Sequence, residues 1–284
     1  MTNTPTADSH SGNLRGDAAP VFSNILCAVD GTRTSLAAVA MAASLAGRGG
    51  RLTLLSVTGE RGSGQFAAAA INPERAKAVL SYAKQLAEEA GVHAATVLDP
   101  GRPPVDVILE HAREHDLLVL GGPPVSRVAG LLVGGVAVEA LSQLTTPTLI
   151  VRRSFGGSLR GRRVVVASDG LEGSERIVRL AGALARSQGA QVTLVHASGS
   201  EARVAGRSIE SQGRELATIV PDACEVVTEP GGAAEVILQA AAHEQAELVV
   251  LGTRRLAGVR ALGSVSRRIV HEAECPVLLV PPEQ

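Results

Sequence analysis

The chain has 284 residues, of which 45% are hydrophobic but only 1% aromatic, and its formal net charge is −1. Because domains usually contain about 150 residues, this length indicates two domains with cores of Ala, Val, Leu and Ile. The near-zero charge excludes the strong positive field that attracts nucleic acid or an anionic membrane. No apolar run approaches the roughly 20 residues that cross a bilayer, so we expect neither nucleic acid nor membrane as a partner.

Residues 1–20 are polar and contain no apolar core of a secretory signal, so they predict a disordered tail. The three cysteines, Cys27, Cys224 and Cys275, share no metal-type spacing. An odd number of cysteines without a signal peptide favours a reducing cytosol, so we expect a cytoplasmic protein. Cys27 lies in an apolar run and is expected to be a small core residue.

In the first half, strands and helices are predicted to alternate. A buried strand at 25–29 runs into Asp30-Gly31, and the helix that follows has apolar residues at helical spacing and ends at Gly47. The remaining strands are expected at 52–57, 94–98, 116–121 and 147–151. They are separated by a polar stretch able to form a helix, a helix over 105–114 and a last helix.

The second half repeats this pattern element by element, with strands expected at 163–167, 192–197, 224–228, 247–252 and 276–280. Its first helix is expected to end at Gly189, and a later helix is expected to span 234–244. Because strands that alternate with helices form parallel sheets, the fold class is α/β, with two tandem doubly wound, Rossmann-like domains of five parallel strands each. The expected boundaries are 21–153 and 163–282, with a linker at 154–162.

The basic run from Arg152 to Arg162 around this linker is expected to be solvated, and a phosphate-contacting arm is the alternative.

Ligands of an open parallel sheet bind beyond the carboxyl ends of the strands, near the switch in strand order. Asp30 and Asp169 follow the first strand of each half, and loops begin at Gly121 and Gly252 after the fourth. The second of these loops reaches Gly263-Ser264, where free N–H groups and a hydroxyl at a helix N-terminus would suit a phosphate. The same pair is equally typical of an ordinary helix cap.

At these residues both halves resemble the universal stress protein family. The resemblance rests on the Asp after the first strand, the Leu-Gly end of the fourth strand, Gly263-Ser264-Val265-Ser266, and the final strand that begins at Cys275-Pro276. It implies a five-stranded parallel fold that dimerises, often through its last strand, so the halves would form an intramolecular pseudo-dimer. A further homodimer stays open. One branch of the family binds ATP at a Gly-x2-Gly-x9-Gly-Ser/Thr loop.

The resemblance also implies candidate binding residues, carried over position by position. The adenine and ribose side would be formed by Ala28, Val29, Asp30 and Val57 in the first half, and by Ala167, Ser168, Asp169 and Ala197 in the second. The phosphate side would be formed by Gly121 and Gly134 in the first half, and by Gly252, Gly263, Ser264, Val265 and Ser266 in the second.

Neither half keeps the whole ATP loop. In the first half, Pro124 replaces the second glycine and Gly135 replaces the Ser/Thr. In the second half Gly263-Ser264 is intact, but Arg255 replaces the second glycine and the loop is two residues shorter. A hydroxyl bond to a charged phosphate contributes about 1.5–3 kcal/mol, so its loss weakens a site without abolishing it. We therefore expect ATP or a related adenine nucleotide, with Mg²⁺, at the second half rather than the first.

Arg255 would either neutralise a phosphate or fill the pocket with its own charge, and the sequence leaves both open.

Patterns of several enzyme classes are absent, among them a Walker A loop and a G-x-S-x-G elbow. An H-x-x-E-H pattern at 111–115 lies on an expected helix, but the second half lacks its histidines, so we expect no metal site. We expect His196 to be partly buried and hydrogen-bonded rather than catalytic.

The sequence therefore predicts a non-catalytic stress-response module that senses an adenine nucleotide. The alternative is a nucleotide-free protein-interaction module of the same fold. A third class, an adenylating or electron-transfer enzyme, would need a catalytic lysine, a metal site or a flavin loop, none of which the sequence contains.

Overall fold

The computed structural model of the chain describes residues 20–58, 72–100, 102–122, 140, 143, 145–152, 159–171, 173–198, 202–253 and 263–282. In these residues, ten strands form one sheet with the order β3-β2-β1-β4-β5-β10-β9-β6-β7-β8. Neighbouring strands are parallel, except that β5 and β10 are antiparallel. The sheet thus consists of two parallel five-stranded halves with the same strand order, joined at their last strands.

The first half has the predicted alternation of strands and helices. Thr32 begins its first helix by accepting a hydrogen bond from the N–H of Ser35, and Gly47, with a φ of 55°, ends it. The elements in chain order are β1 (Asn24–Ala28), α1 (Arg33–Ala46), the short 3-10 helix η1 (Gly47–Gly49), β2 (Arg51–Thr58), α2 (Pro73–Glu89), β3 (Ala94–Pro100), α3 (Pro104–Ala112), β4 (Leu117–Gly121) and β5 (Thr148–Val151).

The second half repeats the first. Gly189, with a φ of 65°, ends its first helix as Gly47 does in the first half. The elements are β6 (Arg163–Ala167), α5 (Ser174–Gln188), β7 (Gln191–Ser198), α6 (Ala202–Ile219), β8 (Cys224–Pro230), α7 (Ala233–His243), β9 (Leu248–Gly252), α8 (Ser264–Glu272) and β10 (Val277–Val280).

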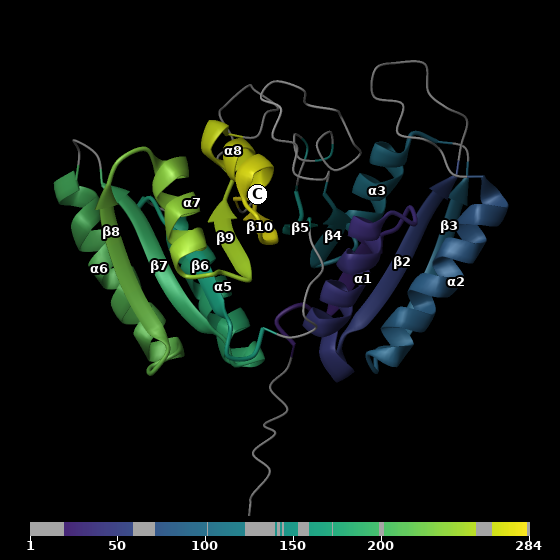
Figure 1. Ribbon diagram of the computed structural model, residues 1–284, viewed down its shortest axis with the longest axis horizontal. Coiled ribbons are helices and arrows are strands. Elements are labelled where there is room, and N and C mark those ends of the chain that lie inside the picture. The colour runs from purple at the N-terminus through teal and green to yellow at the C-terminus, as the bar shows by residue number, and fades with distance from the viewer. Residues whose placement is uncertain are drawn as a thin grey trace, which may run out of the picture.

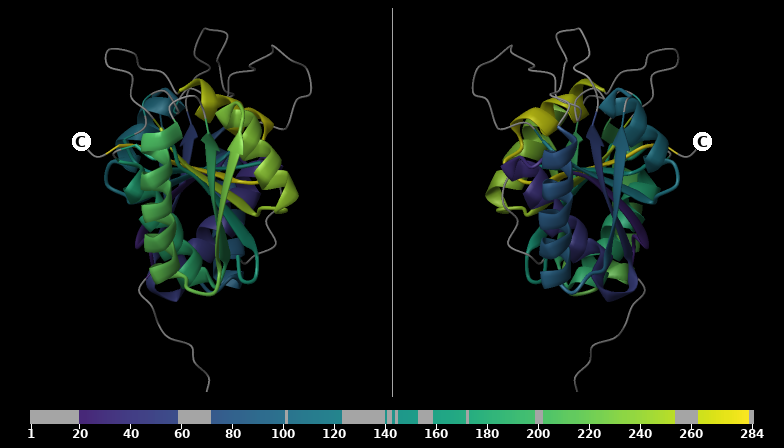
Figure 2. Two further views of the ribbon diagram at one scale, coloured as in Figure 1. Left: turned by 90° about the vertical axis from the view of Figure 1, so that its left-hand side faces the viewer. Right: turned by 90° about the vertical axis from the view of Figure 1, so that its right-hand side faces the viewer.

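Helices cover both faces of the sheet, and a hydrophobic core lies on each side (Figures 1 and 2). One core lies under α1, α2, α5 and α6, and the other under α3, α7 and α8. Strand residues of both halves enter each core, as Leu149 and Leu278 do in the first one. The two repeats therefore share their cores across the junction.

The junction between the halves is the antiparallel pair β5 and β10, in which Leu149 is the partner of Leu278. Figure 1 shows the first half, purple to teal, on the right and the second half, green to yellow, on the left. The carboxyl ends of β2 and β7 both lie at the top of this view. The candidate ligand edges of the two repeats therefore face the same side of the molecule.

The structure confirms the predicted fold class and the burial of Cys27, whose side chain is fully enclosed. The helix predicted over 105–114 is shorter at its carboxyl end than expected. It ends at Ala112, because the N–H groups of Arg113 and Glu114 already form turn hydrogen bonds to Glu110 and His111. Among the described residues, no helix combines the length and the apolar character needed to cross a membrane.

Candidate functional site

The carboxyl ends of three neighbouring strands meet at one edge of the second half. Ala167, the last residue of β6, is the register partner of Val195 in β7 and of Leu251 in β9. Asp169, just after β6, Ala197, near the end of β7, and Gly252, at the end of β9, therefore lie at one edge of the sheet, as the sequence predicts.

The first half has the same arrangement. Ala28 at the end of β1 is the partner of Leu55 in β2 and of Leu120 in β4. Asp30, Val57 and Gly121 accordingly lie at the equivalent edge, so each half contains a candidate site built in the same way.

Asp169 caps a tight turn that leads into α5. Its Oδ1 accepts hydrogen bonds from the N–H of Leu171, at 2.9 Å, and from the hydroxyl of Ser174. Gly170 has a φ of 70°, which a residue with a side chain rarely adopts. The turn therefore fixes where the Asp169 carboxylate lies relative to the start of the helix.

A buried polar network supports this turn from behind. The hydroxyl of Ser168 donates to Oε1 of Gln212 at 2.6 Å and accepts from the N–H of Gly170 at 3.1 Å. The carbonyl oxygen of Ser168 lies 3.0 Å from Nδ1 of His196. Ser168, His196 and Gln212 are 7%, 5% and 1% exposed, so these bonds are shielded from water.

The prediction that His196 is hydrogen-bonded is confirmed, although it is more deeply buried than expected. Gln212 was missed by the sequence analysis. Its position in α6 shares the inward face with the buried residues Ile209 and Leu216, three before and four after it, so helical periodicity could have identified it.

The equivalent turn of the first half lacks this support. Oδ1 of Asp30 accepts from the N–H and the hydroxyl of Thr32, at 2.9 and 2.6 Å, and the N–H of Asp30 lies 3.4 Å from the hydroxyl of Ser35. Val29 stands where the second half has Ser168. Ser56 stands where it has His196, and its buried hydroxyl has no hydrogen-bond partner in the described part of the chain.

The N-terminus of α8, the candidate phosphate side of the second half, begins with a residue that has no capping side chain. Gly263 is its capping residue and supplies no side-chain hydrogen bond to the first turn, which begins at the exposed Ser264. A Cβ added at Gly263 would meet no atom within 4 Å. Ser266 anchors the turn through a 3.2 Å hydrogen bond from its hydroxyl to the carbonyl oxygen of Gly252. Among the described residues, no side chain therefore caps the first N–H groups of α8.

The glycines that end the fourth strands have a packing role in addition to any binding role. A Cβ at Gly121 would lie 2.5 Å from the backbone nitrogen of Ser35, and one at Gly252 would lie 2.5 Å from Cδ1 of Ile177. Both strands thus pass close to the first helix of their own half, which by itself explains a glycine at these two positions. The other loop predictions, Pro124, Gly134, Gly135 and Arg255, lie outside the described residues.

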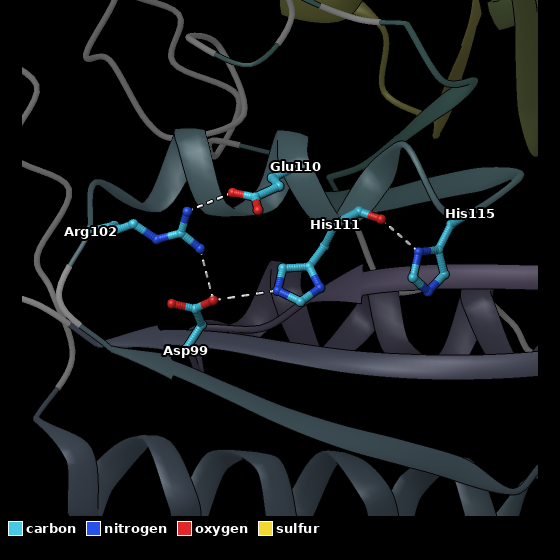
Figure 3. Close-up of polar contacts among 5 residues, drawn as sticks. All are labelled: Asp99, Arg102, Glu110, His111 and His115. Carbon is cyan, nitrogen blue, oxygen red and sulfur yellow. Dashed lines mark hydrogen bonds and ion pairs between the residues drawn. The ribbon is translucent and has the colours of Figure 1, made fainter.

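A charged cluster occurs at the first-half edge, where Asp99 of β3 is the register partner of Val57 (Figure 3). Arg102 bridges the carboxylates of Asp99 and Glu110, at 3.2 and 2.5 Å. Hydrogen bonds to these two carboxylates, that of Glu110 first, raise the pKa of Arg102. The cluster is a set of surface ion pairs, which usually add little stability.

The two histidines of the H-x-x-E-H pattern have different partners (Figure 3). Nε2 of His111 lies 3.4 Å from Asp99, whereas Nδ1 of His115 bonds the carbonyl oxygen of His111 at 2.7 Å. Among the described residues, no group of three or more His, Cys, Asp or Glu side chains is arranged to hold a metal ion.

Comparison with known proteins gives matches in both halves. The model of the universal stress protein family matches residues 22–152 and again residues 161–281. The universal stress protein in the QAH/OAS sulfhydrylase 3′ region of Thermus aquaticus is 36% identical over 135 residues, which are 42% of this chain and 98% of that protein. Universal stress protein YxiE of Bacillus subtilis (strain 168) is 32% identical over 149 residues, 46% of this chain and 100% of that protein.

Among solved structures, a universal stress protein from Archaeoglobus fulgidus DSM 4304 has the same overall fold. Its TM-score is 0.72 at 20% identity, and the match covers 90% of this chain and 97% of that chain. Each of the two sequence relatives therefore corresponds in length to about one half of this chain, whereas the solved structure corresponds to both halves together.

Proposed function

Because this chain belongs to the universal stress protein family, we propose that its second half binds an adenine nucleotide and that the protein acts as a non-catalytic, nucleotide-sensing module of the stress response. The family membership covers both repeats. The proposal goes further in choosing one repeat and one class of ligand.

We choose the second half and a nucleotide because two groups lie at the same edge of the sheet: a rigidly held hydrogen-bond acceptor, the Asp169 carboxylate, and hydrogen-bond donors, the first N–H groups of α8. Asp169 lies on a turn held by a buried network, and the uncapped N-terminus of α8 follows the neighbouring strand β9. A ribose offers hydroxyl donors and a phosphate offers acceptors, so a nucleotide matches both ends of this edge.

In the proposed complex, Ala167, Ser168, Asp169 and Ala197 form the adenine and ribose side. Asp169 accepts a hydrogen bond from a ribose hydroxyl. Gly252, Gly263 and the first turn of α8, Ser264 to Ser266, form the phosphate side. The N–H groups of that turn and the Ser264 hydroxyl donate to phosphate oxygens, and the helix dipole favours the negative charge.

ATP would be accompanied by Mg²⁺, which usually binds through substrate phosphates with few protein ligands. The described residues fit a nucleotide because, among them, nothing lies within 4 Å of a Cβ added at Gly263 and no side chain caps the start of α8. The first half fits less well, because its Asp30 turn lacks the supporting network.

Thermal unfolding with and without nucleotide tests the proposal. A ligand that binds only the folded state stabilises it by RT ln(1 + [L]/Kd), about 2.7 kcal/mol at 100 times Kd. We expect millimolar ATP with Mg²⁺ to raise the melting temperature and the bound ATP to be recovered intact. An unchanged melting temperature would favour a nucleotide-free interaction module, and rapid multiple turnover of ATP would favour an enzyme.

A further inference from the structure

Ser168, the residue directly before Asp169, is held by hydrogen bonds on every polar group that it has. Its N–H donates to the carbonyl oxygen of Val195 at 3.0 Å, and its carbonyl oxygen and hydroxyl are bound by His196, Gln212 and Gly170. These partners come from β7, α6 and the turn itself. The backbone that carries Asp169 is therefore fixed from three directions.

The contact with Ser168 shows which ring nitrogen of His196 carries a hydrogen. A carbonyl oxygen can only accept, so Nδ1 of His196 carries the hydrogen and donates it across 3.0 Å. Because His196 is only 5% exposed, water does not readily replace this donor. Loss of the Nδ1 hydrogen would leave the Ser168 carbonyl oxygen without its buried partner.

The first half is a built-in comparison for this network. Val29 has no hydroxyl to link its turn to a helix. The Ser56 hydroxyl has no partner among the described residues, so Ser56 does not bond the residue before the aspartate as His196 does. The two repeats have the same strands and the same aspartate, but only the second has the buried support. The difference between the halves thus concerns the precision with which the aspartate is held.

We infer that His196 and Gln212 are positioning residues that hold the Asp169 turn, so that the second half selects ribonucleotides over their deoxy analogues. This inference rests on the proposed nucleotide function and adds to it a sugar specificity and two residues. Neither side chain needs to touch the ligand. Both act through Ser168, because a hydrogen bond to a ribose hydroxyl depends on a carboxylate held within a fraction of an ångström.

The test is a set of binding titrations with ATP, 2′-deoxy-ATP and 3′-deoxy-ATP on the full chain. A lost hydrogen bond between the charged carboxylate and a ribose hydroxyl weakens binding about 10- to 150-fold. We expect the wild-type protein to bind at least one deoxy analogue about tenfold more weakly than ATP. In Gln212→Leu and His196→Gln, ATP affinity should fall to that of the analogue, whose own affinity should not change.

His196→Asn is the matched rescue. The amide nitrogen of Asn is as many bonds from Cα as Nδ1 of His, whereas that of Gln corresponds to Nε2. His196→Asn should therefore retain the discrimination that His196→Gln loses. Thr193→Val removes a buried hydroxyl near the opposite end of β7 and should retain it too.

Several results would overturn the inference. If the variants weaken all three ligands equally, the network is only structural. If the wild-type protein binds ATP and both analogues equally, Asp169 makes no hydrogen bond to a ribose hydroxyl that affects affinity. The inference then fails while the nucleotide function stands. A wild-type protein that binds none of the three contradicts the nucleotide function itself. Urea unfolding of each variant identifies any that does not fold, and the Gln212 and His196 variants give independent answers.

Discussion

Arg152, which follows the last strand of the first half, donates a hydrogen bond from Nη1 to the carbonyl oxygen of His271 in the last turn of α8. A side chain of one repeat thus satisfies a terminal carbonyl of a helix in the other. Arg152 is only 7% exposed, its Nε has no hydrogen-bond partner among the described residues, and burial lowers its pKa. This contact adds a polar link to the hydrophobic junction of β5 and β10.

Two substitutions of Arg152 should distinguish the contribution of its packing to stability from the contribution of its charge. Arg152→Ala removes a buried stem as well as the hydrogen bond, and we expect the free energy of unfolding to fall by about 2–3 kcal/mol. Arg152→Met keeps the stem and removes a desolvated cation, so we expect a change within about 1 kcal/mol. Urea unfolding measures both. The exposed Arg268→Ala is the control, and an Arg152→Ala variant as stable as this control would show that the junction does not depend on Arg152.

His271 should make stability depend on pH. Burial, and then the positive charges of Arg152 and Arg267, lower its pKa in the folded protein. The unfolded chain therefore takes up the proton first, so stability is full above about pH 6.5 and falls as the pH drops below that value.

We expect the melting temperature of nucleotide-free protein to fall between pH 7.5 and 5.5, and His271→Gln to reduce that fall. His93→Gln, at an exposed histidine before β3, is the control. An identical pH profile in the His271 variant and the wild-type protein would contradict the assignment.

Substitution by alanine should lower the free energy of unfolding by different amounts at Gly121, Gly252 and Gly263. At Gly121 the added Cβ meets the backbone of Thr34 and Ser35, which cannot move without displacing α1, so we expect a loss of about 2–3 kcal/mol. At Gly252 it meets the end of the Ile177 side chain, which can rotate, so the loss should be about 1 kcal/mol. At Gly263 the added Cβ meets no described atom within 4 Å, so Gly263→Ala should change the stability little. Urea midpoints of the three variants give the order, and a neutral Gly121→Ala would refute the packing argument.

Thiol labelling should follow burial. Burial raises the pKa of both Cys27 and Cys224, but Cys27 is fully enclosed whereas Cys224 is only half-buried at the sheet edge. Cys275 is also buried. Because the thiolate is the reactive form and must be reached by the reagent, we expect iodoacetamide to modify Cys224 first. Mass spectrometry in native buffer and in urea measures the order. Labelling of Cys27 at the rate of Cys224 in native buffer would indicate that the first core opens.

The sequence predicted the strands well because buried parallel strands are continuous apolar runs. Every predicted strand of the second half, such as 163–167, lies within two residues of the observed one. The antiparallel pairing of β5 with β10 could not be derived from residue patterns, since periodicity does not specify which strands meet. The family resemblance implied only that the halves form a pseudo-dimer, often through the last strand, and it did not give the direction of the pairing.

The buried polar residues were the least predictable. The basic run after β5 was expected to be solvated, which is wrong for Arg152, because this side chain turns inward to a carbonyl that is distant in sequence. Helical spacing indicates that Gln212 faces inward in α6, but it does not indicate that its hydrogen-bond partner is Ser168, which is distant in the sequence. Both residues acquire their roles from tertiary contacts, which local sequence patterns do not encode.

The most direct test of the central claim is a calorimetric titration of ATP with Mg²⁺ into Asp169→Ala and into Asp30→Ala. The two variants remove the same carboxylate from equivalent turns of the two repeats. We expect Asp169→Ala to weaken ATP binding about tenfold or more, and Asp30→Ala to bind ATP as the wild-type protein does. Equal effects of the two substitutions, or a larger effect of Asp30→Ala, would contradict the assignment of the nucleotide site to the second half.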